Sequence, residues 1–139
     1  MTLKEVIDNI IYVAKSQPNI KTVKEGNVYD LDSMPDVEYK VVYLTQSQHR
    51  FDNQQNTYNF TLFYIDRLTD DSGNKIDIHS DGIVTINNIL NGLQDCYDME
   101  VETPVSVTTF NQRFVDDCAG VFASVSIVVD NDLGYCYYE

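Results

Sequence analysis

The segment from Thr57 to Leu68, TYNFTLFYIDRL, constrains the fold most, because its side chains alternate along two faces. One set is aromatic or aliphatic throughout: Tyr58, Phe60, Leu62 and Tyr64. The other set begins polar at Asn59 and becomes apolar at Phe63 and Ile65. Alternation with a period of two is typical of a β-strand. Because both sets are apolar toward the end of the segment, we expect a central strand that is covered there on both faces.

Four further segments read as strands around this one. A short strand is expected near Gly26 to Asp30, and an alternating strand from Val37 to Thr45. After Met99, one alternating set runs from Val101 to Thr109, and a last strand runs from Val121 to Val129. The turn Asp116 to Gly120 between the last two predicts a hairpin. The sheet is therefore expected to be mostly antiparallel.

Two helices complete the predicted elements. The first begins at a T-x-x-E capping box formed by Thr2 and Glu5, and Pro18 ends it. The second is expected to start at Asp77 or Ser80. The predicted inward faces consist of Leu3, Val6, Ile7, Ile10, Ile11 and Ala14 in the first helix, and of Ile83, Ile86, Leu90, Leu93 and Tyr97 in the second.

The predicted order is α-β-β-β-α-β-β, which is an α+β fold with both helices packed on one face of the sheet. We expect residues 1–130 to form a single domain and residues 131–139 to form a Tyr-rich arm. The other face of the sheet is left with Tyr, Thr and Asn side chains. An aromatic surface of this kind is typical of a protein contact.

The charge balance excludes several functions. The 139 residues include 9 basic and 22 acidic side chains, which gives a net charge of −13. A general DNA or RNA binder needs clustered Lys and Arg, and so does a protein that docks on an anionic membrane. No apolar run is long enough for a transmembrane helix. The amino-terminal segment is not expected to be a signal peptide, because Glu5, Asp8 and Asn9 interrupt its apolar residues. The three cysteines are expected to be reduced thiols.

The sequence offers no clear catalytic, cofactor or metal site. His49 and His79 lie in polar connecting segments without a neighbouring nucleophile in a known frame. A calcium loop starting at Asp70 fails, because Lys75 stands where the sharp turn needs Gly and Asp81 where a bidentate Glu is needed. No phosphate-binding glycine pattern occurs. The sequence therefore predicts a protein that is not an enzyme and binds no cofactor.

The segment from Val41 to Leu90 contains a recognisable set of residues: Tyr43, Leu44, Thr45, Gln46, Tyr58, Asn59, Phe60, Asp66, Arg67, Leu68, Thr69, Ser80, Asp81 and Gly82. Through these residues it resembles small virion proteins of tailed phages of the crAss-like group. The order of elements is similar to that of tail terminator and neck proteins, which form rings between head connector and tail. The resemblance implies a structural subunit made in the host cytoplasm and built into the virion. Its partners would be copies of itself, six or twelve in a ring, and neighbouring portal, connector or tail proteins.

A ring subunit needs segments that engage its neighbours. The long loop Gln46 to Asn56 and the tail Asn131 to Glu139 are the candidates, although a frayed tail would have the same composition. The expected interface residues are His49, Arg50, Phe51, Tyr135, Tyr137 and Tyr138. Asp70 and Asp71 are expected to face an acidic lumen that repels DNA and lets it pass.

Two other classes of function remain open. One is an acidic inhibitor that mimics DNA, which would need carboxylates spaced like phosphates along one face. The acids of this chain are instead scattered through turns and strands. The other is a small α+β enzyme or ligand-binding module, which a titratable group with a shifted pKa in a deep pocket would indicate.

Overall fold

Strand β4 (Gln55–Arg67) lies at the centre of the sheet, as its two-sided apolar pattern predicts. The computed structural model describes residues 1–27, 38–69, 73–96, 99–111 and 118–130. Besides β4, the elements are α1 (Leu3–Lys15), β1 (Thr22–Glu25), β2 (Val41–Gln46), β3 (Arg50–Phe51), α3 (Lys75–Cys96), β5 (Glu100–Val101), β6 (Val107–Asn111) and β7 (Cys118–Asp130). Tyr97 and the arm at 131–139 lie outside the described residues.

The sheet has the order β1-β2-β4-β7-β5, with β3 added to β4 and β6 added to β7. Only the β1–β2 pair is parallel. The fold is therefore α+β with a mostly antiparallel sheet, and the predicted order α-β-β-β-α-β-β is confirmed for the longer elements. The two-residue strands β3 and β5 add to this order.

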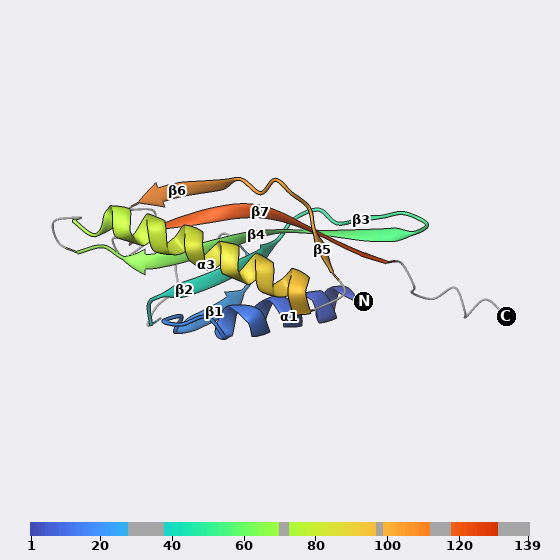
Figure 1. Cartoon of the computed structure of the whole chain (residues 1–139), viewed down its shortest axis with the longest axis horizontal. Coiled ribbons are helices and arrows are strands. Elements are labelled where there is room, and N and C mark those ends of the chain that lie inside the picture. The colour runs from blue at the N-terminus through green and yellow to red at the C-terminus, as the bar shows by residue number, and fades with distance from the viewer. Residues whose placement is uncertain (28–37, 70–72, 97–98, 112–117, 131–139) are drawn as a thin grey trace.

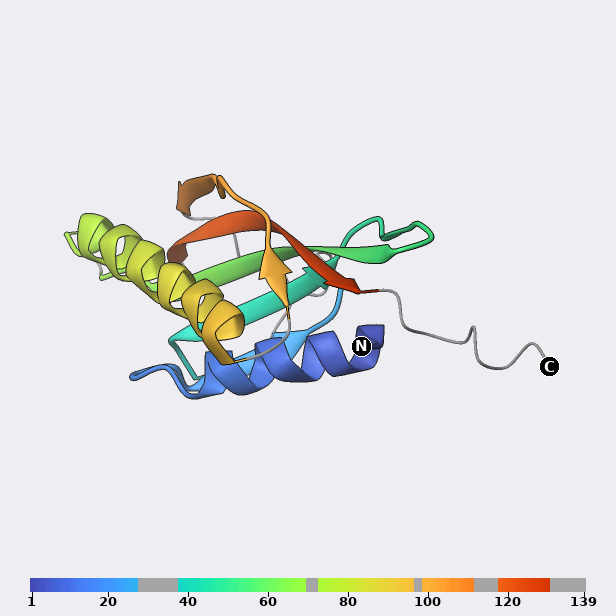
Figure 2. The same cartoon turned by 45° about the vertical axis from the view of Figure 1, so that its right-hand side comes forward.

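Both helices cover the same face of the sheet, as predicted (Figures 1 and 2). The capping box at the start of α1 is confirmed, since Glu5 N donates to Thr2 Oγ1 and Thr2 N donates to Glu5 Oε1, each at 3.2 Å. Helix α1 buries Val6, Ile10, Val13 and Ala14 against α3 and the sheet. Its local capping signal and its apolar spacing therefore agree with its packing.

Helix α3 begins at Lys75, before the predicted caps Asp77 and Ser80. Asn74 explains this earlier start. Its backbone carbonyl accepts the hydrogen bond from Ile78 N, and its side chain is hydrogen-bonded to residues outside the helix. Asn74 Oδ1 accepts from Thr69 N at 2.9 Å, and Nδ2 donates to Arg67 O at 3.2 Å. This bridge to the end of β4 sets the helix start, and sequence spacing does not reveal it.

The inward face of α3 is partly as predicted. Ile86, Leu90 and Leu93 are buried, whereas Ile83 is 45% exposed and does not belong to the core. Ile78 and Ile89 are also buried, and Ile76 is 69% exposed. The outer side of α3 thus carries aliphatic side chains that the core does not use.

The strand boundaries differ from the prediction in three places. β1 ends at Glu25, before the strand expected near Gly26 to Asp30, and β2 starts at Val41. β7 starts at Cys118, inside the expected turn. Residues 28–30, Val37, Asp116 and Asp117 of these predictions lie outside the described residues. The single strand expected from Val101 to Thr109 is divided into β5 and β6, both of which pair with β7. Pro104 lies between them and has no N–H to donate to the ladder.

The face opposite the helices is not the aromatic contact surface that the sequence predicted. Its aromatic side chains gather in a second buried cluster that includes Val41, Tyr43, Phe63, Ile65 and Cys118. Tyr39, Phe110 and Phe122 pack against this cluster from its margin. Because the aromatic rings cover one another, the middle of this face presents hydroxyl and amide side chains, and charged side chains such as Lys24, Arg50 and Arg67 lie at its margin.

Gly82 determines how closely α3 approaches the sheet. A Cβ atom at this position would lie 2.7 Å from Val121 Cγ2 and 2.8 Å from Tyr64 Cδ1. Both neighbours are buried core residues, so neither moves freely.

We predict that Gly82→Ala destabilises the protein by about 1–2 kcal/mol. Overpacking a core costs roughly 1–3 kcal/mol, and the better helix propensity of Ala recovers about 1 kcal/mol. Chemical denaturation measures the difference. The control is Asn91→Ala on the exposed side of the same helix, which should be neutral or slightly stabilising. Equal stability of the two variants would contradict the close approach at Gly82.

Candidate assembly surfaces

The β3–β4 hairpin projects beyond the helices at one end of the sheet (Figures 1 and 2). Arg50 of β3 pairs with Thr57, and Phe51 pairs with Asn56. On the other side of β4, the strand β7 continues to the tip of the hairpin, where Asp130 is opposite Gln55. The candidate interface residues 49–51 therefore lie on a structured projection instead of a free loop.

His49 fixes the base of this projection. Asn59 N donates to its Nδ1 at 3.1 Å, so the proton of the neutral ring is on Nε2, which lies 3.1 Å from Gln46 Oε1. The ring meets Tyr58 edge-on at 5.4 Å and Phe60 at 5.6 Å between centroids. Burial lowers the pKa of His49 below its usual value of 6.5. His49 is thus a structural residue at neutral pH.

Phe51 is the exposed apolar group of the hairpin. Its side chain is 68% exposed, and its ring lies 6.2 Å from that of Tyr58. The turn next to it is closed by Asp52, whose Oδ1 accepts from Gln54 N at 2.8 Å and Gln55 N at 2.6 Å. These two backbone hydrogen bonds lower the pKa of the Asp52 carboxyl. Phe51 is therefore presented on a preformed turn, which reduces the entropy cost of binding a partner.

The other predicted interface and lumen residues fall outside the described part of the chain. These are Tyr135, Tyr137 and Tyr138 of the tail, and Asp70 and Asp71 of the expected lumen. The last described residue before the tail is Asp130, which lies beside the β3–β4 hairpin. Since residue 131 follows it directly, the tail starts at the end of the molecule that carries His49, Arg50 and Phe51.

The sheet face opposite the helices presents a surface of small polar side chains, which we call the hydroxyl face. It consists of Thr57, Asn59, Thr61, Thr108, Ser124 and Ser126, placed on one side by the strand register. Asn59 and Ser126 are hydrogen-bonded to each other across β4 and β7. None of these six residues carries a charge.

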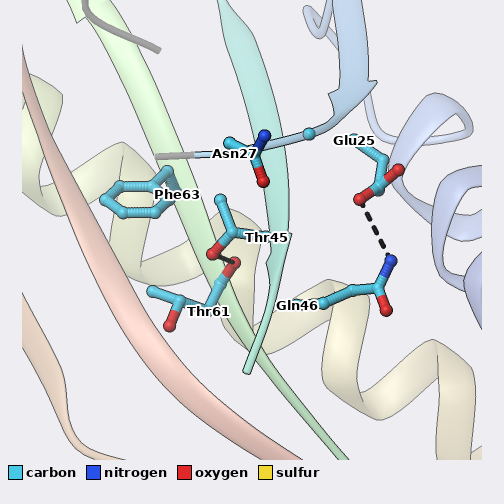
Figure 3. A pocket seen from close by; sticks show the side chains of 7 residues that line it. Glu25, Asn27, Thr45, Gln46, Thr61 and Phe63 are labelled. Carbon is cyan, nitrogen blue, oxygen red and sulfur yellow. Dashed lines mark hydrogen bonds between the residues drawn. The ribbon is translucent and has the colours of Figure 1, made fainter. Parts of the chain in front are cut away.

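A shallow pocket lies between β1 and the hydroxyl face, with a volume of about 570 Å³. Figure 3 shows its side chains, with Thr45 and Thr61 on the floor and Glu25 bound to Gln46 at the rim, where the two are joined by a 3.3 Å hydrogen bond. The remaining described lining residues are Gly26, Asn27 and Phe63. The described lining residues of this pocket include no histidine, cysteine or lysine; the titratable side chain among them is that of Glu25.

The exposed side of α3 forms a second uncharged surface, which we call the α3 stripe. Its residues are Ile76, Ser80, Ile83, Val84, Asn87 and Asn91, all exposed. Sequence analysis missed this surface, because it assigned Ile83 to the core. The spacing of Ile76, Ile83 and Val84 at i, i+7 and i+8 was the signal that marks one face.

Polar groups that sequence analysis considered for chemistry have structural partners. His79 Nε2 lies 3.1 Å from Phe110 O and joins α3 to β6, and Cys118 is buried with its Sγ 3.4 Å from Tyr39 Oη. Asp81 pairs with Lys40 at 3.5 Å. In the described ranges, no three His, Cys, Asp or Glu side chains gather as a metal site would require.

Lys40 is the most deeply placed cation of this region and remains protonated. Burial lowers its pKa, but Tyr64, Asp66 and Asp81 raise it by more, so the net shift is upward. The carboxylate of Asp66 lies 4.0 Å from Lys40 Nζ. The charged Lys40 ammonium thus pairs with Asp81 of α3 at 3.5 Å.

Neither described helix has the length and apolar character that crossing a membrane requires. α3 is long enough at 22 residues, but it carries Asp77, Asp81 and Asp95 as well as several Asn side chains.

We predict that His49 makes stability depend on pH. In the unfolded chain the ring gains a proton near pH 6.5, whereas the folded chain resists protonation because burial lowers the pKa of His49. Its contribution is complete above about pH 6.5 and is lost as the pH falls further. The free energy of unfolding between about pH 7 and 5 should therefore fall more steeply in the wild type than in His49→Gln.

Gln48→Ala is the matched control, because Gln48 is the exposed neighbour of His49 and does not titrate. It should keep the wild-type pH dependence. A His49 ring that titrates at or above pH 6.5 by NMR would contradict the assigned hydrogen bond from Asn59 N.

No protein-family model matches the chain, and a search of curated proteins finds no match to its sequence. What the chain does must therefore be inferred from its own surfaces.

Proposed function

We propose that the chain is a non-enzymatic structural subunit of a ring in the neck or tail of a tailed phage. In this role it joins head to tail or completes the tail, and DNA passes through the ring. The observation that carries the proposal is a pair of different uncharged surfaces, the α3 stripe and the hydroxyl face, on opposite sides of one molecule. The resemblance of the segment Val41 to Leu90 to phage virion proteins supplies the phage context.

Two different surfaces on opposite sides favour a ring over a simple dimer. In a two-fold dimer, each copy uses the same patch, so the second uncharged face would remain exposed. In a head-to-tail arrangement, one face of each copy meets the other face of the next, and the copies close into a ring when the rotation between neighbours divides a full turn. Six or twelve copies are expected from the resemblance.

The β3–β4 hairpin and the tail serve as arms in this proposal. The hairpin offers Phe51 and Arg50 on a preformed turn, and the tail starts beside it at Asp130. Tyr135, Tyr137 and Tyr138 would add large contact area at low entropy cost. The arms would reach neighbouring subunits and the portal, connector or tail proteins above and below the ring.

The net charge of −13 agrees with a channel for DNA. An acidic lumen repels the phosphate backbone and keeps the genome from binding to the wall. Asp70 and Asp71 are the proposed lumen residues, and in the sequence they follow the last residue of β4, Arg67, after Leu68 and Thr69. The ring therefore needs no specific nucleic-acid contact.

We predict that purified, DNA-filled particles of the phage contain the chain at a multiple of six copies. Quantitative mass spectrometry against the major capsid protein measures this number. A chain that is abundant in infected cells but missing from particles would refute the ring. The acidic DNA-mimic inhibitor would then be the leading alternative, and binding to a nucleic-acid-binding host protein would be its test.

We predict that replacing Asp70 and Asp71 with Lys slows DNA ejection, because the wall would then attract phosphate. The matched control is Asp8→Lys with Asp95→Lys, which changes the net charge equally at two exposed helix residues that belong to neither the α3 stripe nor the hydroxyl face. Ejection followed by dye fluorescence should be slow only in the first variant. Equal rates in both variants would exclude Asp70 and Asp71 from the lumen.

A further inference from the structure

A pocket of about 210 Å³, which we call the helix pocket, lies between the end of α1 and the first half of α3. The two helices lie side by side on the sheet and diverge toward the start of α3 (Figure 2). α3 contributes residues spaced three and four apart, which share one face of the helix: Asp81, Val84, Thr85 and Asn88. Residues 17–20, which follow α1, form another wall, and Lys40 and Tyr64 complete the lining.

The hydroxyl of Tyr64 is buried and has no hydrogen-bond partner, although Tyr64 lines the helix pocket. The charges of Lys40, Asp66 and Asp81 act on this hydroxyl, so the hydroxyl end of the ring is the end near the pocket. Lys40 is close enough to act in this way, but no hydrogen bond of normal geometry joins the two groups. Burial raises the pKa of Tyr64, so the hydroxyl keeps its proton at neutral pH. It is therefore a buried donor without an acceptor, which destabilises a protein until a partner binds.

The helix pocket offers both donors and acceptors around this hydroxyl. Lys40 Nζ and Asp81 Oδ2 are 3.5 Å apart, which is longer than a strong charged hydrogen bond. Their side chains are 27% and 58% exposed, so each is accessible to a further partner. Thr85 and Asn88 add a hydroxyl and an amide, and both groups can donate and accept.

The charges around the helix pocket do not favour an ion. Asp66 lies behind Lys40, with its carboxylate 4.0 Å from Lys40 Nζ. Asp77 is one turn before Asp81 on α3, and the backbone N of Lys21 donates to Lys40 O at 2.9 Å. Because charges of both signs lie together here, neither an anion nor a cation gains a consistent attraction. A neutral ligand with many hydrogen-bonding groups does not depend on this balance.

We infer that the helix pocket binds a sugar ring, either as a free monosaccharide or as the terminal unit of a glycan. Two hydroxyl groups on neighbouring ring carbons lie about one hydrogen-bond length apart, so one can accept from Lys40 Nζ while the other donates to Asp81 Oδ2. A third oxygen can accept from the Tyr64 hydroxyl. Val84 and Ile20 offer aliphatic contact to the ring carbons.

The size of the helix pocket suits one ring. Its volume of about 210 Å³ is below the range of roughly 300–1,000 Å³ that is typical of pockets for drug-sized ligands. The inference goes beyond the proposed ring subunit and does not depend on it.

NMR titration of the isotope-labelled full chain tests the site. The sugar probes are glucose, galactose, mannose and N-acetylglucosamine. Glycine, spermidine and sulfate represent a zwitterion, a cation and an anion. At least one sugar should shift the amide signals of the residues that line the helix pocket, and the three charged probes should not. Disaccharides that end in the bound sugar then distinguish the sources, because they bind only if the pocket accepts the terminal unit of a glycan.

Two neighbouring asparagines provide a matched pair of variants. Asn88 lines the helix pocket, whereas Asn87 is exposed on α3 outside it. Asn88→Ala should weaken sugar binding about 10-fold, because it removes a hydrogen bond to the ligand. Asn87→Ala should bind like the wild type. Both side chains are exposed, so both variants should fold, which thermal unfolding verifies.

Tyr64→Phe separates a ligand-binding hydroxyl from a structural one. Without sugar, this variant should be at least as stable as the wild type, because it removes a buried hydroxyl that has no partner. Sugar binding should nevertheless weaken about 10-fold. A less stable variant with unchanged binding would contradict this role for the hydroxyl, since the hydroxyl would then have its partner within the protein.

Three results would overturn the inference. The first is that none of the sugars shifts the signals of the pocket residues. The second is that glycine, spermidine or sulfate shifts them instead, and the third is that Asn87→Ala and Asn88→Ala lose binding equally. None of these results bears on the proposed ring, because the number of copies per particle is measured independently.

Discussion

The pairing of β4 with β7 is the interaction on which the structure depends. The two strands are matched residue by residue from Gln55–Asp130 to Arg67–Cys118, although they are far apart in the sequence. One side of this ribbon carries the core beneath both helices, and the other side carries the second cluster around Phe63. The same ribbon extends past the helices to form the projecting hairpin. The body, the hydroxyl face and the arm are therefore parts of one antiparallel ladder.

Two glycines hold the remaining layers close to this ribbon. A Cβ on Gly120 would lie 1.8 Å from Tyr64 O, so no larger residue fits at that crossing. Gly82 brings α3 against Tyr64 and Val121 on the helix side. Because α3 is fixed in this way, its rotation is fixed too, and Ile76, Ile83 and Val84 are directed away from the core. The α3 stripe follows from packing inside the molecule.

Sequence patterns correctly predict the structural features that depend only on neighbouring residues. The capping box at Thr2 and Glu5 and the alternation from Tyr58 to Ile65 need only neighbouring residues, and both are confirmed. The start of α3 depends on Asn74 reaching Arg67 and Thr69, which is a tertiary contact. The burial of Phe63 depends on the rings of Phe110 in β6 and Phe122 in β7, which pack against it. The spacing of residues along the chain predicts neither of these tertiary contacts. The exposure of Ile83 also depends on tertiary packing, so the spacing did not predict it either.

Net charge alone would oppose any assembly of identical copies, since each adds −13 to the whole. The distribution of charge changes this conclusion. At physiological salt, exposed charges more than about 8 Å apart are largely screened, so acids at turns and edges repel weakly across a contact. Charges buried at the centre of a contact would not be screened, and each would cost several times more. For a strongly acidic chain, uncharged surfaces are therefore the least costly ones to bury against another copy, and the α3 stripe and the hydroxyl face are two such surfaces on opposite sides of the molecule.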